Sequence, residues 1–228
     1  MKDIPISSII DYLRFMETLG FDKLPLEVPE TVCNDEFCLL KEAALKQVLQ
    51  EIGDCKRCRL SLERTNIVFG EGDADADLMF IGEAPGADED KQGRPFVGRA
   101  GQLLTRLINK MGFKREEVYI ANTVKCRPPG NRKPSADEIF TCNPFLKKQI
   151  SIIKPIVIMT LGDVATKTIL GDVGNISRVR GKKFDYEGIT VVPTFHPSYL
   201  LRNASKKWDT WNDAQLVLKI LEEAKRNI

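Results

Sequence analysis

Short apolar segments alternate with segments of helical periodicity over most of this chain, and this alternation limits the fold more than any other feature. The apolar segments are DLMFIGE (77–83), EVYIANTV (117–124), KPIVIMTLG (154–162) and ITVVPTF (189–195). Strands that alternate with helices form a parallel sheet that carries helices on both faces. We therefore predict an α/β fold with a central, mainly parallel, four-stranded sheet. KKFDYEG (182–188) is expected to form a hairpin with the last apolar segment.

The N-terminal residues 1–45 are predicted to form an appendage. Residues 7–21 have the apolar spacing of an amphipathic helix, and residues 24–37 carry prolines and acids that predict a linker. Residues 39–55 predict a second helix. The remaining residues, 46–228, are then expected to form one large domain.

Net charge and hydropathy exclude few classes of partner. A net charge of +2 neither requires nor excludes nucleic acid, because binding depends on local patches of charge. No apolar run approaches the ~18 residues needed to span a bilayer. The first ten residues, MKDIPISSII, lack the basic start and apolar core of a signal peptide. We therefore expect a cytoplasmic protein that does not bind a membrane.

Four cysteines are candidates for a metal centre. Cys55 and Cys58 form a C-x2-C pair, and 15 residues separate Cys126 from Cys142. Four thiolates can hold zinc or a [4Fe–4S] cluster, and the irregular second pair fits iron–sulfur better than a zinc ribbon. The alternative is four unrelated buried thiols, but the flanking sequences DCKRCR and KCRPP are too polar for a core. The two cysteines of the linker region are interpreted as ordinary thiols.

Ligands of open α/β sheets bind outside the carboxyl ends of the strands, so the segments that follow the apolar runs are the candidate site. GEAPGADED (82–90) lacks both the GK[ST] of a P-loop and the GxGxxG of a dinucleotide site. What remains is a rigid turn that exposes backbone amides and the Glu83 carboxylate. Asp88 and Asp90 are expected to lie on a solvated acidic face.

An aromatic residue and an amide follow in two further loops. Phe96, in GRPFVGRAGQLL, is either a core residue or a stacking platform for a base, and the helix that starts at Gly98–Gly101 could hold a phosphate. Asn122 ends a strand, where its amide can meet a pyrimidine edge. The loop after it is basic and stiffened by proline and glycine, which suits a phosphodiester backbone. Its cations are Lys125, Arg127, Arg132 and Lys133.

The chain has one histidine among its 228 residues, His196, within TFHPSYLLRN (194–203). It follows a predicted strand, and the apolar residues after it stand where a loop is normally polar and exposed. A histidine at a strand end is a catalytic candidate, although a buried histidine that bonds to backbone is the alternative. No serine or cysteine nucleophile motif accompanies it, which excludes a hydrolase triad.

These segments, in this order, resemble the family 4 uracil-DNA glycosylases, the iron–sulfur type of bacteria and archaea. The resemblance runs from about residue 48 to the end of the chain and leaves out the N-terminal appendage. Each feature alone is weak, but together and in register they are highly specific. The features are the C-x2-C pair at 55–58, GEAPGADED, GRPFVGRAGQLL, YIANTVKCRPPGNRKP, Cys142 and TFHPSYLLRN.

The resemblance implies a three-layer α/β/α sandwich that removes uracil from DNA by cleaving its N-glycosidic bond. It implies that Phe96 stacks on a flipped uracil, that Asn122 hydrogen-bonds its pyrimidine edge and that His196 donates to uracil O2. The catalytic residues are then expected to be His196, Glu83 and Asn122. Backbone groups expected to line the pocket are those of Gly82, Glu83 and Ala84.

The resemblance also assigns the DNA contacts and the metal ligands. Leu200 or Leu201 is expected to wedge into the duplex, because flipping a base costs a few kcal/mol and an apolar wedge can fill the vacated space. Arg202 is expected to contact phosphate, as are Arg127, Arg132 and Lys133 of the basic loop. A [4Fe–4S] cluster with a structural role is expected on Cys55, Cys58, Cys126 and Cys142.

One difference from the better-known family 1 leaves open which residue activates the attacking water. That family has an aspartate that orients water and a tyrosine that excludes thymine, where this chain has Ala84 and Gly86. The difference is typical of family 4. Glu83 is the first candidate to activate water and Glu89 the second.

Two rival functions are weighed against this reading. A related branch links covalently to uracil-DNA, but it carries an inserted basic loop with a histidine, which DKQGRPFVG here lacks. A non-catalytic iron–sulfur DNA-binding module would explain the cysteines and the basic loop, but not Glu83, Phe96, Asn122 and His196 together. We expect a monomer whose partner is uracil-containing DNA, double- or single-stranded.

Overall fold

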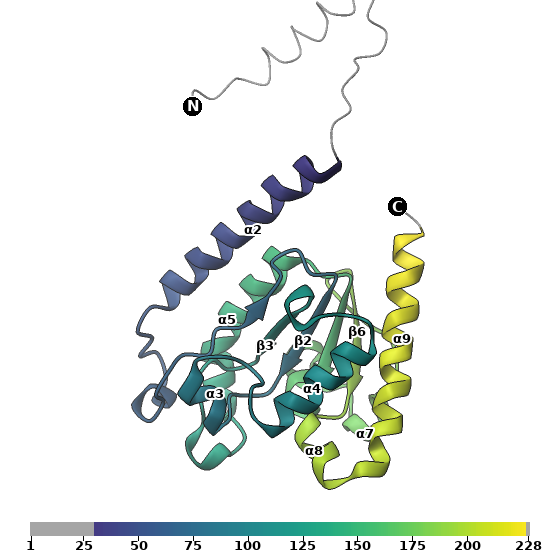
Figure 1. Cartoon of the computed structure of the whole chain (residues 1–228). Coiled ribbons are helices and arrows are strands. Elements are labelled where there is room, and N and C mark those ends of the chain that lie inside the picture. The colour runs from purple at the N-terminus through teal and green to yellow at the C-terminus, as the bar shows by residue number, and fades with distance from the viewer. Residues whose placement is uncertain (1–29, 227–228) are drawn as a thin grey trace, which may run out of the picture. The chain divides into compact units, whose positions relative to one another are not determined.

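A computed structural model describes residues 30–226, with side chains from Cys38 onward (Figure 1). The chain divides into two compact units, Met1–Phe37 and Cys38–Ile228, and the functional segments all lie in the second. The helix predicted at 7–21 lies outside the described residues. Among the described helices, none is long and apolar enough to cross a membrane.

The sheet of the second unit has six strands rather than the predicted four. Their order is β1-β3-β2-β4-β6-β5, and the four inner strands run parallel to one another. The edge strands β1 and β5 are antiparallel. The strands are β1 (Glu71–Gly72), β2 (Leu78–Gly82), β3 (Tyr119–Asn122), β4 (Val157–Leu161), β5 (Phe184–Tyr186) and β6 (Ile189–Thr194).

The four inner strands are the four apolar segments of the sequence, and the predicted hairpin between β5 and β6 is confirmed. The count of four strands was wrong because both edge strands are short and only partly buried. Neither edge strand therefore carries a continuous apolar run, which is the sequence signal of a buried parallel strand.

Helices follow the strands as the alternation predicts. The α-helices are α2 (Glu30–Ile52), α3 (Ala87–Gln92), α4 (Arg99–Lys110), α5 (Ala136–Ile153), α6 (Asp163–Leu170), α7 (Ile176–Val179), α8 (Pro197–Arg202) and α9 (Lys207–Lys225). Short 3-10 turns are η1 (Arg59–Leu62), η2 (Arg115–Glu117), η3 (Pro129–Asn131) and η4 (Ala204–Lys206). A capping box stands at the start of α5, since Ser135 N–H donates to the Glu138 carboxylate at 2.8 Å.

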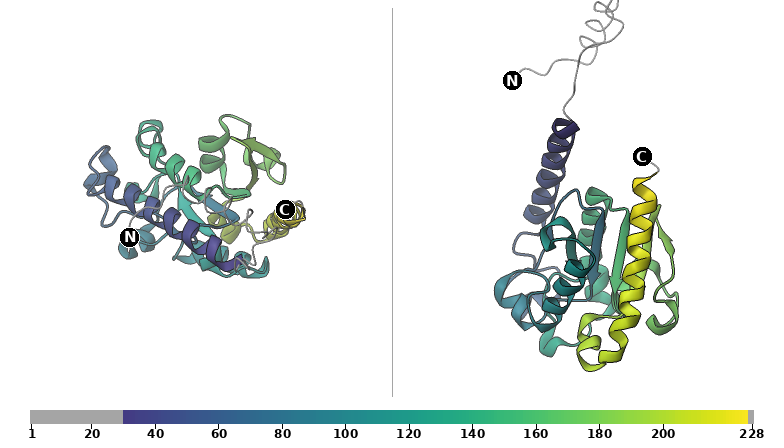
Figure 2. Two further views of the ribbon diagram at one scale, coloured as in Figure 1. Left: turned by 90° about the horizontal axis from the view of Figure 1, so that it is seen from above. Right: turned by 45° about the vertical axis from the view of Figure 1, so that its right-hand side comes forward.

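Two apolar cores confirm the three-layer arrangement (Figures 1 and 2). Alternate residues of β2 point to opposite faces of the sheet, as a pleated strand requires. Leu78 and Phe80 pack in one core with α4 and α9, and Met79 and Ile81 pack in the other with α5 and α6. The right-hand view of Figure 2 shows α9 running along the sheet. Helices therefore cover both faces, and the strand ends are left as the open edge.

Helix α2 begins earlier than the sequence indicated, at Glu30, and so runs through the second half of the segment predicted as a linker. In the sequence, proline stands just before this helix and acids follow at its start, an arrangement that favours a helix N-terminus. The C-terminal part of α2 belongs to the second unit. Its Val48 and Ile52 pack on Phe145 of α5 in a small third core.

Candidate active site and cysteine cavity

A cavity of about 620 Å³ lies at the carboxyl ends of the parallel strands, which is the edge expected for a ligand in this type of sheet. Each inner strand contributes to its wall. Glu83 follows β2, Asn122 ends β3, Asp163 follows β4, and His196 follows β6. The tertiary fold therefore gathers in one place the polar residues that the sequence spreads over more than a hundred positions. Ala84 and Phe96 line the same cavity.

Asn122 is the most unusual residue of this cavity. Only 1% of its surface is exposed, and neither its Nδ2 nor its Oδ1 has a hydrogen-bond partner among the residues that the structure describes. A buried donor or acceptor without a partner costs about 1–3 kcal/mol, so nearly all such groups are paired in folded proteins. The amide is held there by the sheet, because Thr123 N–H donates to Gly82 O at 2.9 Å and ties β3 to β2. An amide kept unpaired in a cavity wall is available to a ligand.

Gly82 explains how Asn122 and Phe96 come to share one wall. A Cβ at position 82 would collide with Asn122 Oδ1 and with the Phe96 ring. The absence of a side chain therefore allows the ring and the amide to lie against the end of β2. The Phe96 ring centroid lies 5.9 Å from that of His196, with the planes tilted by 37°. Phe96 is buried in the apolar core, and its ring also lines the cavity, so the core interpretation is confirmed and stacking on a base stays a prediction.

The Phe96 backbone is fastened on both sides. Its φ of 51° lies in the left-handed region, which costs a side chain-bearing residue on the order of 1–3 kcal/mol. On one side Arg115 donates to the Pro95 carbonyl, and Arg115 is itself bound to Glu71 at 2.7 Å. On the other side Gly101 lets the first turn of α4 approach the Phe96 carbonyl, where a Cβ would collide. The ring is thus held in a conformation that it would not adopt alone.

The Glu89 carboxylate also fastens the loop that carries Phe96, and its oxygens are therefore already hydrogen-bonded to the protein. Its carboxylate accepts hydrogen bonds from the backbone N–H groups of Val97 and Gly98, both at 2.8 Å, and from Gly86 N–H at 3.1 Å. Two amides at the start of α4 are consequently satisfied by a protein carboxylate, and the phosphate site predicted there is not supported. Asp90 was predicted to be solvated, which is wrong. It is buried and accepts from Thr65 N–H at 2.9 Å.

Glu83 has no hydrogen-bond partner for its carboxylate in the described part of the chain, and it lines the cavity. Burial raises its pKa above the ordinary value, Lys133 opposes that rise, and Asp163 adds to it. Of the two candidates for water activation, the first is therefore free and the second is bound to three amides. The geometry favours Glu83.

His196 is half-buried and acts as the N-cap of α8. Its Nδ1 accepts a hydrogen bond from Ser198 N–H at 3.1 Å and lies 2.7 Å from Ser198 Oγ. Because a backbone amide can only donate, Nδ1 carries no proton and the proton of the neutral ring is on Nε2. Burial lowers the His196 pKa to about 4, and the nearby Arg202 contributes. The ring is then neutral at neutral pH, with an N–H donor at Nε2.

The two leucines after the histidine were expected to be exposed, and for Leu200 this is wrong. Leu200 is 4% exposed, because α8 packs on α4 and Leu200 faces into that contact. Its neighbour Leu201 is 38% exposed. A wedge must be able to reach the duplex, so the structure favours Leu201 over Leu200. Arg202 lines the cavity beside it.

The basic loop after Asn122 is less positive than its sequence suggests. Arg132 donates to both carboxylate oxygens of the buried Glu138, at 2.7 and 2.8 Å, and Arg59 donates to the same group at 2.9 Å. These bonds hold the pKa of Glu138 well below its usual range. Arg127 donates to Asn131 at 2.8 Å and does not line the cavity, whereas Arg132 and Lys133 do.

Lys125 was counted among the cations that face DNA, and this is wrong. It is 2% exposed, and its Nζ donates to Gln149 Oε1 at 2.6 Å and to the Asn122 carbonyl at 2.9 Å. Burial lowers its pKa to about 8. The same residue donates its backbone N–H to Cys142 Sγ at 3.3 Å. Lys125 therefore lies between the wall of the cavity and the cysteines.

The four predicted ligand cysteines line one small cavity behind that wall. Within the described residues no group of three or more His, Cys, Asp or Glu side chains is arranged to hold a single metal ion. Arg57 donates to Cys55 Sγ at 3.3 Å, and Arg64 donates to Cys126 Sγ at 3.5 Å. Apolar side chains such as Leu60 and Phe145 form the rest of the wall. The cysteines in this wall are Cys55, Cys58, Cys126 and Cys142.

Sequence reasoning missed three residues that support the site. Ser198 orients His196, and its place two residues into a helix that starts with His-Pro could have indicated this. Arg115 holds the carbonyl before Phe96, and Glu138 neutralises the basic loop. For Arg115 no local signal exists, because its partners are distant in the chain, whereas Glu138 stands only six residues after Arg132.

Comparisons with known proteins agree with the geometry. The family model of the Uracil DNA glycosylase superfamily matches residues 69–225. The chain is 48% identical over 187 residues to a type-4 uracil-DNA glycosylase of Thermotoga maritima, which covers 81% of this chain and 95% of that relative. It is 47% identical to a protein of the same description from Sulfurisphaera tokodaii, over 79% of this chain and 81% of the relative.

A third such relative, from Saccharolobus solfataricus, is 44% identical over 81% of this chain and 84% of its own length. The matched region contains the cavity, its wall and the C-terminal helix. The chain therefore belongs to the Uracil DNA glycosylase superfamily and, within it, to the type-4 uracil-DNA glycosylases, and it is an enzyme of that family.

Proposed function

We propose that this enzyme excises uracil from DNA by flipping the nucleotide into the cavity and hydrolysing the N-glycosidic bond, which leaves an abasic site. A base inside a duplex must leave the stack before its glycosidic bond is accessible. The observation that carries the proposal is the buried Asn122 amide with no partner. Membership of the family and the cavity at the strand ends support it.

The amide of Asn122 suits the edge of uracil. It offers a donor and an acceptor side by side, and uracil offers a carbonyl oxygen at C4 beside an N–H at N3. Phe96, held against Gly82, provides the face on which the base stacks. A ligand that pairs this amide recovers the cost of leaving it unpaired in the free protein.

His196 supplies the donor that the reaction needs. Cleavage leaves negative charge on the departing uracil, and a donor aimed at O2 stabilises that charge. The Nε2–H of a neutral ring serves this purpose, because Ser198 already occupies Nδ1. The low pKa of His196 keeps the ring neutral through the physiological range.

Glu83 is proposed to orient and deprotonate the attacking water. As a carboxylate without a protein partner it can accept the proton, and it can stabilise the positive charge that develops on the sugar. Its raised pKa brings it closer to the working pH than an ordinary glutamate. Glu89 is proposed to hold the Phe96 loop instead, since its oxygens accept from Gly86, Val97 and Gly98.

The four cysteines are proposed to hold a [4Fe–4S] cluster. They surround one cavity, yet no three ligands are arranged for a single ion within the described residues, which suits a group larger than zinc. The two arginines beside the sulfurs, Arg57 and Arg64, provide donors that would offset thiolate charge. A cluster there would supply no chemistry to the reaction and would fasten the C-x2-C turn to β3 and α5.

On the DNA side, Leu201 is proposed to fill the space left by the flipped base, and Arg202 to contact phosphate beside it. Leu201→Ala is expected to slow excision from duplex about tenfold and to leave a single-stranded substrate nearly unaffected, because only the duplex has a stack to fill. Leu200→Ala is expected to act through stability instead, at about 2–5 kcal/mol, because Leu200 is buried. Equal rates on both substrates for Leu201→Ala would exclude it as the wedge.

The direct test is base release. The purified protein is incubated with a uracil-containing oligonucleotide, and alkali then cleaves any abasic site. Cleavage at the uracil position is expected for the wild type and not for an identical strand with thymine. DNA binding without base release would instead support a non-catalytic module, and an adduct that survives denaturation would support covalent trapping. Iron and acid-labile sulfide in the purified protein test the cluster against zinc.

A further inference from the structure

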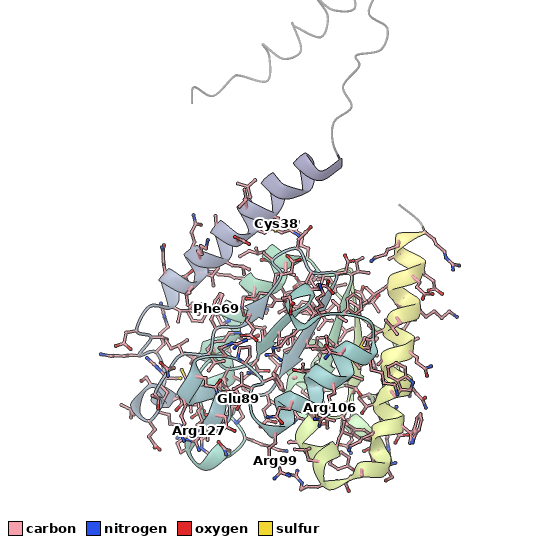
Figure 3. All side chains as sticks on the ribbon, in the orientation of Figure 1. Cys38, Phe69, Glu89, Arg99, Arg106 and Arg127 are labelled. Atoms are coloured by element: carbon pink, nitrogen blue, oxygen red, sulfur yellow. The ribbon has the colours of Figure 1, made fainter. Side chains whose placement is uncertain are left out.

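Three basic residues lie on one exposed face of α4. Arg99, Arg106 and Lys110 are spaced by seven and four residues, which places them along the same side of a helix. All three are exposed, and none forms an ion pair with any described residue. Figure 3 shows Arg99 and Arg106 on this helix, on the opposite side of Glu89 from Arg127 in that view. The stripe spans about 16 Å of helix axis.

The start of α9 continues this surface. Lys207 is exposed without an ion pair in the described chain, and Lys206 is exposed and paired only with Asp209, at 3.0 Å. Trp208 is 69% exposed, which is unusual for so large an aromatic. Lys110 joins the two helices, because its Nζ lies 5.5 Å from the Trp208 ring centroid and 4.1 Å from that of Trp211.

The surface is continuous with the active-site cavity. Arg99 lines that cavity, as does Arg202 at the end of α8. A shallow apolar groove of about 200 Å³ between α4 and α9 shares Phe195 with the cavity and reaches Lys110 and Lys207. Exposed Leu201, the proposed wedge, stands on α8 between Leu200, which lines this groove, and Arg202, which lines the cavity. Asp209 is the one acid in the segments 99–110 and 197–211.

Packing alone does not account for these residues. The contact of Lys110 with Trp211, which is half-buried, explains how α9 is held against α4. It does not explain why Trp208 stays in solvent, or why Arg99, Arg106 and Lys207 lack acidic partners. On the opposite rim, by contrast, Glu138 neutralises the loop cation Arg132. The α4–α9 side therefore carries four cations without an ion pair in the described chain, Arg99, Arg106, Lys110 and Lys207, whereas the opposite rim carries two, Arg127 and Lys133.

We propose that this α4–α9 surface binds the DNA duplex that flanks the flipped nucleotide. The surface comprises Arg99, Arg106, Lys110, Lys206, Lys207 and Trp208. Its cations contact the phosphates of one strand, and Trp208 packs against a deoxyribose. A stripe of about 16 Å corresponds to about five base-pair steps on one side of the lesion. The inference rests on the proposed function, and it adds the face and the length of DNA that the enzyme covers.

Salt dependence of binding tests the cations. The double variant Arg106→Gln/Lys207→Gln removes two charges that hold no other side chain, and Lys147→Gln on α5 in the opposite layer is the matched control. Binding of a duplex that carries an abasic product site is measured over a range of salt. The slope of log K against log salt is expected to fall by about 0.9 for each lost phosphate contact, thus by nearly two units, with no change for the control.

Trp208→Ala tests the aromatic contact. It is expected to weaken duplex binding about five- to tenfold with an unchanged salt slope, because no charge is lost. Excision from a uracil-containing trinucleotide, which is too short to reach the surface, is expected to stay at the wild-type rate in all variants. Wild-type slopes and affinities in both variants would overturn the inference. Failure of the wild type on the trinucleotide and on duplex would instead refute the proposed glycosylase function, while the binding slopes would still report on the surface.

Discussion

The active-site cavity and the cysteine cavity differ in how their polar atoms are satisfied. In the first, the Asn122 amide and the Glu83 carboxylate have no partners within the described chain. In the second, the sulfurs of Cys55, Cys126 and Cys142 each receive a hydrogen bond from the protein. The unpaired groups of the first cavity cost free energy in the free protein, and a bound ligand that pairs them would recover it. The second is arranged like the surroundings of a permanent group.

Lys125 lies between the two. Its ammonium supports the Asn122 carbonyl, and its backbone amide supports Cys142. A shift of Lys125 would therefore move hydrogen-bond partners in both cavities. Substitutions in the cysteine cavity should act on stability, substitutions in the active-site cavity on rate, and substitutions of Lys125 on both.

The largest effect is expected from the cysteines. Structural metal centres contribute on the order of 10 kcal/mol to folding, so Cys126→Ala should lower the melting temperature by more than about 10 °C and abolish iron binding. Cys38→Ser is the matched control, because Cys38 does not line the cavity and its thiol donates to Asp73 Oδ1 instead, at 3.9 Å. Melting curves and iron content provide the measurement. A stable, iron-free Cys126→Ala protein with full activity would break the comparison.

Glu83→Gln is expected to reduce excision at neutral pH by about 10²–10⁴-fold, the usual contribution of a general base. The carboxylate is the active form, so the wild-type rate should fall as pH decreases through a Glu83 pKa that lies above 4.5. His196 does not limit this range, because it stays neutral until its own pKa of about 4.

The pH–rate profile of Glu83→Gln should accordingly be flat down to the region where His196 gains its proton. Glu89→Gln is the comparison variant. It should disturb the Phe96 loop and lower the rate without removing the acid limb, because Glu89 binds backbone amides rather than water. An acid limb that persists in Glu83→Gln and disappears in Glu89→Gln would reverse the assignment.

Asn122→Ala and His196→Ala are each expected to slow excision by about 10²–10³-fold, the loss that follows removal of one preorganised donor. For Asn122→Ala the melting temperature should stay level or rise, because the variant removes an unpaired buried amide that costs about 1–3 kcal/mol. Single-turnover excision and thermal melting measure the two quantities. Near-wild-type excision by His196→Ala would refute its role, and a sharply destabilised Asn122→Ala would show that the amide has a partner.

The smallest effect is expected from Lys125→Met, which keeps the length of the side chain and removes its charge. Gln149 Oε1 and the Asn122 carbonyl then lose a donor, at a cost of about 1–3 kcal/mol in stability. A several-fold loss of excision should accompany it as Asn122 shifts, whereas Lys147→Met, at an exposed position of the same helix as Gln149, should change neither. A loss of stability with full excision would show that the two cavities are independent.

Local patterns in the sequence predict the four inner strands, the edge that carries the site and most of the residues there. These follow from local patterns: an apolar run is a buried strand whatever its neighbours, and parallel strands bring their carboxyl ends together. Phe96, Asn122 and His196 were identified in this way and do line one cavity. The edge strand β1 was not predicted, because a short, partly buried strand has a weak local pattern, and β5 was predicted as a hairpin arm but left out of the count of four.

Which of two similar residues has hydrogen-bond or packing partners, and which has none, depends on contacts between distant parts of the fold. Glu83 and Glu89 stand six residues apart in one turn, yet Glu89 is bound by amides from the next loop. Leu200 and Leu201 are neighbours, and the packing of α8 on α4 buries the first alone. In the sequence Lys125 belongs to a basic loop, but in the fold its ammonium is buried and donates to Gln149 of α5. Burial and pairing depend on partners far away in the chain, and no local pattern records them.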